Sequence, residues 1–280
     1  MKICLRDGSF SGASMGLAGD NASESPKHLE WVRDPECDTG IVFDTDQFIG
    51  KQCSFRRGLR RYAILIEPRC LSYTHYSNAQ KYHRQYDAIF SYDTFLVNSI
   101  PNGYFMPIGG SWIDPSLWGV DSNPKRRLLS MIMSDKNTTE GHALRHQIRA
   151  KYGGRMAIYG RGINPIARKH GALSPFMYSV VIESCRSDYY FSEKLIDCLS
   201  VGTVPIYWGC TGIDAFFNTR GMIKIDSIDD LPGVLESLSK SDYESRMDDI
   251  MENLDRARRY RIPEDWLFEN YPKLFREADQ

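Results

Sequence analysis

The sequence predicts an α/β fold of two Rossmann-like domains that face a central cleft. Short apolar segments alternate with helix-like segments along the chain, which is the pattern of strands covered by helices. Residues 108–124 are rich in glycine, proline and other residues that interrupt regular structure, and they separate a first set of expected strands from a second. A chain of 280 residues is long enough to form two such domains.

We therefore expect an N-terminal domain at residues 1–120, a second domain at 121–262 and a helical tail at 263–280 that packs back on the first domain. The segment 108–124 is expected to be the linker. The expected strands lie at residues 40–43, 62–66, 88–90, 104–106, 128–133, 156–159, 179–182 and 204–208. Helices are expected at residues 142–151, 193–201 and 243–260.

The charge balance argues against a nucleic-acid-binding protein. The 35 basic and 36 acidic residues nearly cancel, whereas such proteins usually carry a basic excess. Two basic clusters, Arg56-Arg57 with Arg60-Arg61 and Lys125-Arg126-Arg127, are expected to lie on the solvated surface. The alternative is that one of them lines a local basic cleft for a phosphorylated ligand.

The cysteine pattern predicts reduced thiols. The seven cysteines form no C-x-x-C pair, which argues against both a disulfide framework and a zinc site. We find neither an apolar run after Met1 nor a stretch of about 20 apolar residues, the length a membrane span needs. These features predict a cytoplasmic protein (of the host cell, if the chain is viral) without a membrane anchor.

The most informative segment is residues 178–209. An apolar strand is expected to end on Glu183 and Ser184, and a loop leads from it to Ser192, a good helix N-cap. The helix that follows buries its leucine and isoleucine side chains, and Gly202 stands where a left-handed C-terminal cap is needed.

The start of that helix is suited to a nucleotide. Its free N–H groups and partial positive charge favour a diphosphate, and Lys194 adds a full charge in the first turn. Glu193 could accept hydrogen bonds from ribose hydroxyls. The alternative is that Glu193 and Lys194 are solvent-exposed residues of a surface helix and bind no ligand.

The whole segment resembles the signature of the family-10 fucosyltransferases, which runs roughly E-N-S, Y-x-T-E-K and V-P-V/I-x-W/L-G. The matching residues are Glu183-Ser184, Tyr190-Phe191-Ser192-Glu193-Lys194 and Val204-Pro205-Ile206-Tyr207-Trp208-Gly209. The family has an asparagine where Ser184 stands. The resemblance implies a GT-B-like fold and a nucleotide-sugar donor, bound by Glu183, Ser184, Ser192, Glu193 and Lys194.

Weaker resemblances to the same family extend upstream. The residues Ser134 to Asn137, Leu144-Arg145 and Ile158-Tyr159-Gly160 are similar to its S-x-x-N, arginine and V-F-G elements, which implies that Arg145 contacts the donor diphosphate. Arg161, just past an expected strand, is a second candidate.

The N-terminal half is similar to the family in two places. Residues 64–68 resemble its strand ending in E-S-P, and residues 86–93 resemble its F-D-Y-A-I-G-F-D segment. The family places its general base at the first of these glutamates, which implies Glu67. Asp87, Asp93 and Asp20 are the next candidates for the base.

We expect an inverting glycosyltransferase. If Lys194, Arg145 and the helix N-terminus supply enough positive charge for the leaving diphosphate, no metal or other cofactor is needed. The small chain with exostosin-like character also resembles small viral xylosyltransferases, which implies a UDP-xylose donor and a β-linkage to a fucose of a viral glycan. A GDP-fucose-dependent fucosyltransferase stays open, and so does a non-catalytic module that binds nucleotide sugars or glycans.

Two patterns point instead to a metal. Asp44-Thr45-Asp46 follows an expected strand and copies the D-x-D motif of metal-dependent glycosyltransferases. His142 and His146 stand four residues apart, as in zinc sites, but without the glutamate of an H-E-x-x-H motif. The expectation remains that none of these residues binds a metal.

Overall fold

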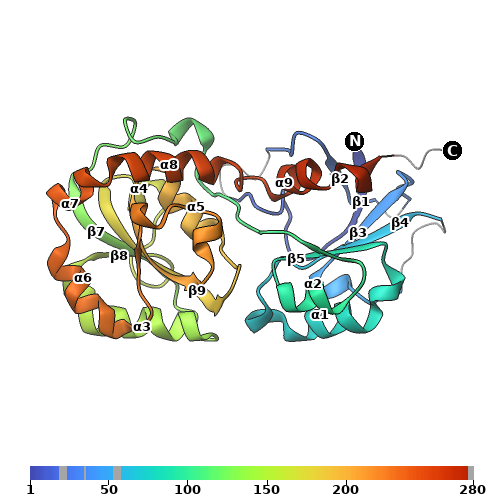
Figure 1. Cartoon of the computed structure of the whole chain (residues 1–280), viewed down its shortest axis with the longest axis horizontal. Helices are drawn as coiled ribbons and strands as arrows, with labels where there is room; N and C mark the ends of the chain where they lie inside the picture. Colours follow the sequence, from blue (N-terminus) through green and yellow to red (C-terminus); the bar gives the residue numbers. More distant parts are fainter. Residues whose placement is uncertain (19–23, 35, 53–57, 277–280) are drawn as a thin grey trace. The chain divides into compact units, whose positions relative to one another are not determined.

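The computed structural model describes residues 1–18, 24–34, 36–52 and 58–276. These residues form two compact units. Unit 1 contains the described residues up to Gly110 together with those from Ile262 onward, and unit 2 runs from Ser111 to Arg261. Each unit is a parallel sheet with helices on its two faces (Figure 1). The predicted α/β fold with two Rossmann-like domains is therefore confirmed.

The sheet of unit 1 has the strand order β2-β1-β3-β4-β5-β6, and every neighbouring pair is parallel. The strands are β1 (Lys2–Arg6), β2 (Glu30–Val32), β3 (Ile41–Thr45), β4 (Arg60–Ile64), β5 (Ala88–Ser91) and β6 (Gly103–Phe105). The sequence analysis missed β1 and β2. Because the strands are parallel, all their carboxyl ends lie at one edge of the sheet, and the strand order reverses between β1 and β3.

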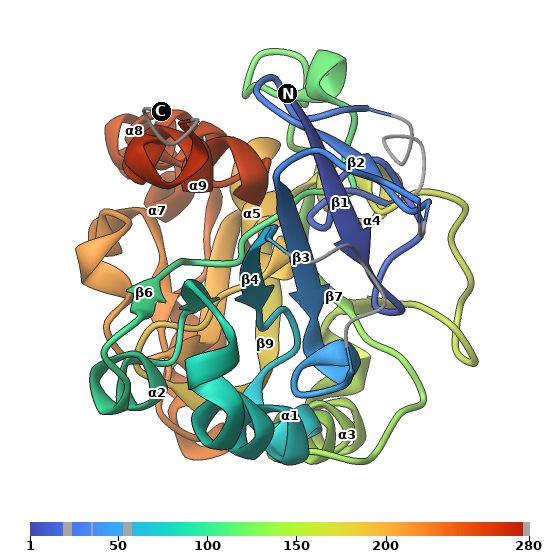
Figure 2. The same cartoon turned by 90° about the vertical axis from the view of Figure 1, so that its right-hand side faces the viewer.

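Helices α1 (Arg69–Tyr82) and α2 (Thr94–Ser99) lie on one side of this sheet and α9 (Pro263–Asn270) on the other (Figures 1 and 2). The ring of Phe43 lies at the centre of the core, against those of Tyr62, Phe90 and Phe275. The C-terminal segment is also fixed by a buried carboxylate. Glu264 accepts hydrogen bonds from the Ser14 hydroxyl at 2.7 Å and the Trp31 indole at 2.9 Å.

Unit 2 has a second parallel sheet in the order β11-β10-β9-β7-β8. Its strands are β7 (Arg127–Ile132), β8 (Ala157–Tyr159), β9 (Phe176–Ser187), β10 (Val204–Cys210) and β11 (Ile223–Lys224). Its helices are α3 (Glu140–Tyr152), α4 (His170–Leu173), α5 (Glu193–Ser200), α6 (Leu231–Ser237), α7 (Lys240–Ser245) and α8 (Met247–Arg258). The predicted helix 243–260 is thus two helices.

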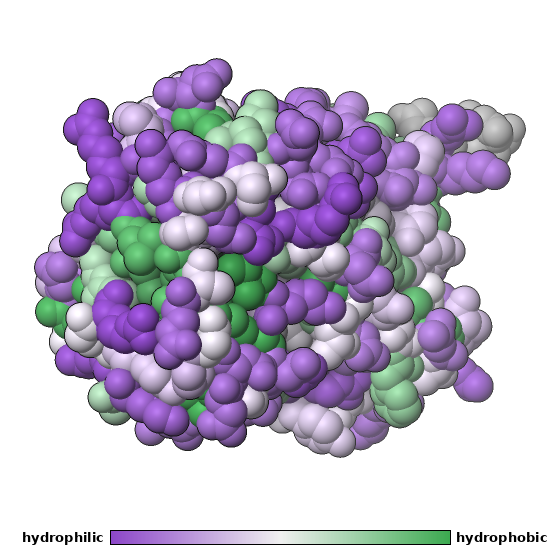
Figure 3. Space-filling view, turned by 60° about the vertical axis from the view of Figure 1, so that its left-hand side comes forward, coloured by the Kyte–Doolittle hydropathy of each residue, from purple (hydrophilic) through white to green (hydrophobic). Residues whose placement is uncertain are grey.

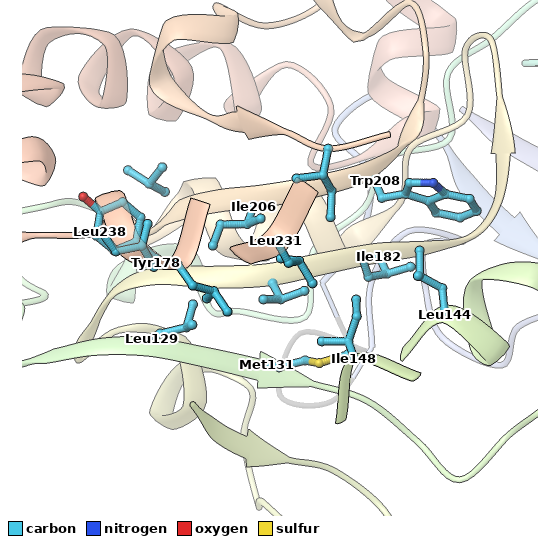
Figure 4. Close-up of a cluster of buried hydrophobic side chains, with 14 of the residues drawn as sticks. Leu129, Met131, Leu144, Ile148, Tyr178, Ile182, Ile206, Trp208, Leu231 and Leu238 are labelled. Carbon is cyan, nitrogen blue, oxygen red and sulfur yellow. The ribbon is translucent and has the colours of Figure 1, made fainter. Parts of the chain in front are cut away.

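Alternate side chains of the central strands pack on opposite faces of the unit 2 sheet. Tyr178 and Ile182 of β9 belong to the cluster that contains Leu144 and Ile148 of α3 (Figure 4). Val181, between them, belongs instead to the cluster around α5. The sheet therefore lies between α3 and α5, and both helices begin at its carboxyl edge.

The chain passes from unit 1 to unit 2 within the expected linker, between Gly110 and Ser111, and the part of the linker after Gly110 contributes to the unit 2 core. Ile113 and Trp118 are buried against α5. Lys125, expected on the surface, donates hydrogen bonds to the carbonyls of Ser174 and Val201, and burial lowers its pKa to about 7. A composition rich in helix and strand breakers shows that a segment is irregular, but not that it is exposed.

The other basic cluster also departs from expectation, since Arg61 forms an ion pair at 2.6 Å with the fully buried Asp44. Arg56 and Arg57 lie outside the described residues. The prediction of reduced thiols is wrong for Cys4 and Cys37, which form a disulfide between β1 and the turn before β3. The two residues are 33 positions apart, so only the fold shows that they meet.

The face of the molecule in Figure 3 is largely hydrophilic, with hydrophobic residues in small separate patches. None of the helices in the described part of the chain is long and apolar enough to cross a membrane.

Candidate functional site

The carboxyl edge of the unit 2 sheet brings together most of the residues predicted to bind a donor. The strand order reverses at β7, which has β8 on one side and β9 on the other. Ligands of doubly wound sheets bind at such a switch point. Around it lie the start of α3, the end of β9 and the start of α5, which carry Arg145, Glu183, Ser184, Ser192, Glu193 and Lys194.

Glu183 lies inside β9, which continues to Ser187, whereas the sequence predicted that the strand ends on Glu183 and Ser184. The pairing of β9 with β10 shifts register after Ile182, so the strand is irregular at this residue. Opposite it, Gly209 has a φ of +156°, and a side chain there would come within 2.5 Å of Glu183 Cγ. Gly141 of α3 approaches the Glu183 carbonyl so closely that a Cβ would lie 1.8 Å from its oxygen. The two glycines make room for this section of β9.

The buried carboxylate of Glu183 fixes the loop before α5. It accepts hydrogen bonds from the Ser192 backbone N–H at 2.9 Å and from the Ser192 hydroxyl at 2.7 Å. Burial raises the pKa of Glu183, an effect opposed by Lys194, 3.8 Å away, and by the Ser192 hydrogen bonds. Since both oxygens are engaged within the protein, this carboxylate sets the position of the helix start.

Helix α5 begins and ends as predicted. Ser192 is its N-cap, and its hydroxyl accepts hydrogen bonds from the N–H and the ammonium of Lys194, at 3.4 and 3.1 Å. At the other end Gly202 has a φ of +68°, and hydrogen bonds from the N–H groups of Gly202 and Thr203 close the last turn.

A compact group of charges surrounds the first turn of α5. Glu193 Oε1 accepts hydrogen bonds from the ammonium groups of Lys169 and Lys194, both at 3.2 Å. Lys169 also pairs with Asp197 at 2.9 Å, and its nitrogen lies 3.9 Å from the centre of the Trp112 ring. Asp197 is fully buried and accepts further hydrogen bonds from Ser111 and Trp112.

This arrangement keeps Glu193 ionised. Burial alone would raise the pKa of Glu193, but Lys169 and Lys194 hold it far below its usual range. Glu193 Oε2 accepts no hydrogen bond from any residue described in the structure. An ionised carboxylate with one open oxygen is suited to accept hydrogen bonds from ligand hydroxyls.

The sequence analysis missed Lys169 and Asp197. Asp197 stands one helical turn after Glu193, so two acidic side chains on one buried helix could have indicated a missing cation. Nothing in the sequence shows that the cation is Lys169, which belongs to the segment before α4.

Arg145 reaches the same place from α3. Arg145 is only 5% exposed. Its guanidinium donates two hydrogen bonds to the Ile182 carbonyl, one from Nε at 3.1 Å and one from Nη2. Within the described residues Nη1 donates no hydrogen bond. Arg145 thus holds β9 with one side of its guanidinium and has a donor left for an anion.

His142 and His146 each have a hydrogen-bond partner of their own. His142 Nδ1 lies 3.1 Å from the Thr138 hydroxyl, and His146 Nε2 lies 3.0 Å from the Lys136 carbonyl. Burial and nearby positive charges, first among them that of Arg145, lower the pKa of His142 to about 4. His142 is therefore neutral at pH 7, mainly because it is buried.

The two remaining residues predicted to bind a donor differ in position. Ser184 is 6% exposed and follows Glu183 in β9. Arg161 is exposed after β8, and it has no side-chain contact with the other predicted residues in the part of the chain that is described.

In unit 1, Glu67 lies at the carboxyl edge of the sheet. Strand β4 ends at Ile64, two residues earlier than predicted, and the exposed Glu67 stands just before Pro68, the N-cap of α1. The Tyr76 hydroxyl donates to the Glu67 carbonyl at 2.9 Å, which helps to fix this loop.

The two carboxylates of Asp44-Thr45-Asp46 do not act as a pair. Asp44 is bonded to Arg6 and Arg61 and to the Tyr86 hydroxyl at 2.8 Å. Asp46, in contrast, has a φ of +27°, and its carboxylate accepts a hydrogen bond from the Ser9 hydroxyl. The backbone turns at Asp46, so the alternation that would place both side chains on one side is lost.

The alternative bases differ in their surroundings. Asp87 precedes β5, at the opposite edge of the sheet from Glu67, and accepts the Arg61 N–H at 2.7 Å. Asp93 caps α2 and pairs with Arg69 at 2.6 Å. Asp20 lies outside the described residues.

Sequence comparison gives a partial match. No protein-family model matches the chain. Over 109 residues, 38% of the chain, it is 28% identical to the Alpha-(1,3)-fucosyltransferase FucT of Helicobacter pylori. The match spans 23% of the length of that relative.

Three solved structures are similar over almost the whole chain. An alpha1,3-fucosyltransferase with GDP aligns with 99% of this chain and 91% of its own, at 14% identity and a TM-score of 0.58. The same kind of enzyme with GDP-fucose gives a TM-score of 0.52 at 14% identity, over 100% and 91% of the two chains. An alpha-glucosyltransferase in complex with UDP aligns over 99% and 100%, at 10% identity and a TM-score of 0.60. These likenesses show that the chain has the GT-B fold.

Removing Lys169 should lower the free energy of unfolding, because its ion pair with the buried Asp197 is lost. In Lys169→Met the carboxylate of Asp197 stays buried without its cation, and breaking a buried pair costs about 3–5 kcal/mol of stability. Chemical denaturation should show this loss in Lys169→Met and much less in Lys169→Met/Asp197→Asn, which keeps an acceptor for Ser111 and Trp112. Equal stability of wild type and Lys169→Met would contradict the pairing.

Proposed function

We propose that this protein is a glycosyltransferase that transfers a sugar from a nucleotide-sugar donor to a glycan hydroxyl. The observation that carries the proposal is the switch point of unit 2. There an ordered helix start, the ammonium of Lys194 and an open guanidinium donor of Arg145 lie beside an ionised carboxylate. The similarity to solved transferases that hold GDP, GDP-fucose and UDP supports the same conclusion.

The donor would bind with its diphosphate at the start of α5. The Lys194 side chain is 30% exposed and bonds to Ser192 and Glu193, so its ammonium can turn toward a phosphate. Lys169 would then still form an ion pair with the ionised Glu193. Nη1 of Arg145 would supply a second charged donor. The open oxygen of Glu193 would accept hydrogen bonds from the ribose. Ser184 and Arg161 are further proposed donor contacts.

Transfer would proceed with inversion, with Glu67 as the general base. Glu67 takes the proton of the acceptor hydroxyl, whose oxygen forms a bond to the anomeric carbon as the bond from that carbon to the diphosphate breaks. The nucleoside diphosphate leaves with added negative charge, which Lys194, Arg145 and the N-terminus of α5 stabilise. The exposure of Glu67 beside Pro68 supports this role, because the carboxylate is accessible on a restrained backbone.

The proposed donor is UDP-xylose, transferred to a fucose in β-linkage, with GDP-fucose as the alternative. The argument for UDP-xylose is the resemblance of the sequence to small viral xylosyltransferases. The argument for GDP-fucose is the resemblance of residues 178–209 to fucosyltransferases. A binding module without turnover would keep the unit 2 site and need no base.

The first test concerns the donor site. Lys194→Ala should weaken the binding of a nucleoside diphosphate by about 1.5–3 kcal/mol, the usual contribution of a charge-assisted hydrogen bond. Titration calorimetry with UDP and GDP measures this change and shows which base is preferred. Lys224→Ala, on the edge strand β11, removes the same charge as a control. Unchanged affinity in Lys194→Ala would remove Lys194 from the site.

The second test concerns metal dependence. We propose that no metal is required, because Lys194 and Arg145 supply the positive charge that a divalent ion would otherwise bring. Turnover should therefore survive excess EDTA, and Asp46→Asn should not create a requirement for added manganese. Activity that EDTA abolishes and manganese restores would overturn this proposal.

The third test separates an enzyme from a binding module. Glu67→Gln keeps the size of the side chain but removes its basicity, so turnover should fall by about 10²–10⁴-fold. The affinity for the nucleoside diphosphate and the melting temperature should stay close to those of the wild type. Near-normal turnover would mean that another group is the base.

A further inference from the structure

Asp46 has an unusual backbone at the carboxyl edge of the unit 1 sheet. It directly follows β3 and is 1% exposed. Its φ of +27° is the only positive value of a non-glycine residue within the described chain. Such strain persists only where the surrounding structure enforces it, and it is most common at functional sites.

The carboxylate of Asp46 connects three strand ends. Oδ1 accepts hydrogen bonds from the backbone N–H groups of Ile66 at 3.0 Å and Glu67 at 3.4 Å, in the loop after β4. Oδ2 accepts the Ser9 hydroxyl at 2.8 Å, in the segment after β1. Asp46 therefore holds the backbone that carries the Glu67 side chain.

The charged neighbour that acts on Asp46 is the carboxylate of Glu67. Burial raises the pKa of Asp46 to about 6, against the hydrogen bonds of Ser9 and Ile66, and the charge of Glu67 raises it further. Asp7 bonds to the N–H of the same Ser9 at 2.7 Å, and Arg33 lies 3.5 Å from its carboxylate. No described cation forms an ion pair with Asp46 itself. The repulsion between the two carboxylates is mutual, so Asp46 and Glu67 titrate as a coupled pair.

We propose that Asp46 is a positioning residue for Glu67. Its hydrogen bonds to the backbone of residues 66 and 67 place the Glu67 carboxylate, and its negative charge makes that carboxylate a stronger base. The inference rests on the proposed role of Glu67, and it gives the second aspartate of the D-x-D sequence a function that needs no metal.

Two variants separate the two effects. Asp46→Asn tolerates a positive φ and keeps an acceptor for the backbone N–H groups, but it removes the charge. Asp46→Gly also accommodates the φ and removes the acceptor as well. Glu30→Gln, an exposed residue at the start of β2, removes one acidic charge at the opposite edge of the sheet as a control.

The measurement is the pH profile of transfer to a fucoside from UDP-xylose or GDP-fucose, whichever donor the calorimetry selects. In Asp46→Asn the acidic limb of kcat/KM should move to lower pH, because Asp46, whose pKa is about 6, no longer titrates beside Glu67. In Asp46→Gly kcat should fall by at least 10-fold, while the KM for the donor, bound by unit 2, stays within about 2-fold. Glu30→Gln should match the wild type.

The outcomes also distinguish this inference from the proposed function. If Glu67→Gln loses turnover but both Asp46 variants keep the wild-type kcat and acidic limb, Asp46 has no such role and the function stands. If Glu67→Gln keeps turnover, the base has been misassigned and the inference falls with it. Should Asp46→Gly fail to fold, Asp46→Asn decides alone, because an unmoved limb overturns the inference.

Discussion

The unit 2 site depends on one buried interaction, the clamp of Glu183 on Ser192. A fully buried carboxylate is costly unless hydrogen bonds satisfy it, and here both its oxygens are held by a single residue. That residue is also the N-cap of α5. Satisfying the carboxylate therefore fixes where the helix starts, and the helix start fixes Glu193 and Lys194. This arrangement requires glycine at positions 141 and 209, because a side chain at either position would collide with Glu183.

The two units differ in the charged groups at their carboxyl edges. In unit 2 Lys169 and Lys194 pair with the carboxylates of Glu193 and Asp197, and Arg145 adds a further cation. At the edge of unit 1, Asp46 and Glu67 are acidic. The first environment suits a leaving diphosphate and the second suits proton removal. The GT-B fold permits many functions, so this division of charge supports the proposed transfer more than the fold does.

The D-x-D sequence shows why a short motif needs its backbone. Two aspartates at alternate positions of a strand would point to the same side and could bind one ion. Asp44 keeps the strand geometry and is neutralised by Arg6 and Arg61 from neighbouring strands. Asp46 is turned by its positive φ toward Ser9 and the loop of Glu67. The same three letters therefore contain a structural carboxylate and a proposed positioning residue.

The sequence by itself determined the α/β fold and the local features of α5: the Ser192 cap, the buried helix face and the Gly202 terminus. These depend on periodicity and backbone preferences within a few residues. Only the tertiary structure decided the partners. Lys169 meets Glu193, Cys4 meets Cys37, and the half-buried Lys125 bonds to carbonyls at the ends of α4 and α5. Each of these contacts joins residues far apart in the chain, so its existence depends on how strands and helices pack, which no local pattern specifies.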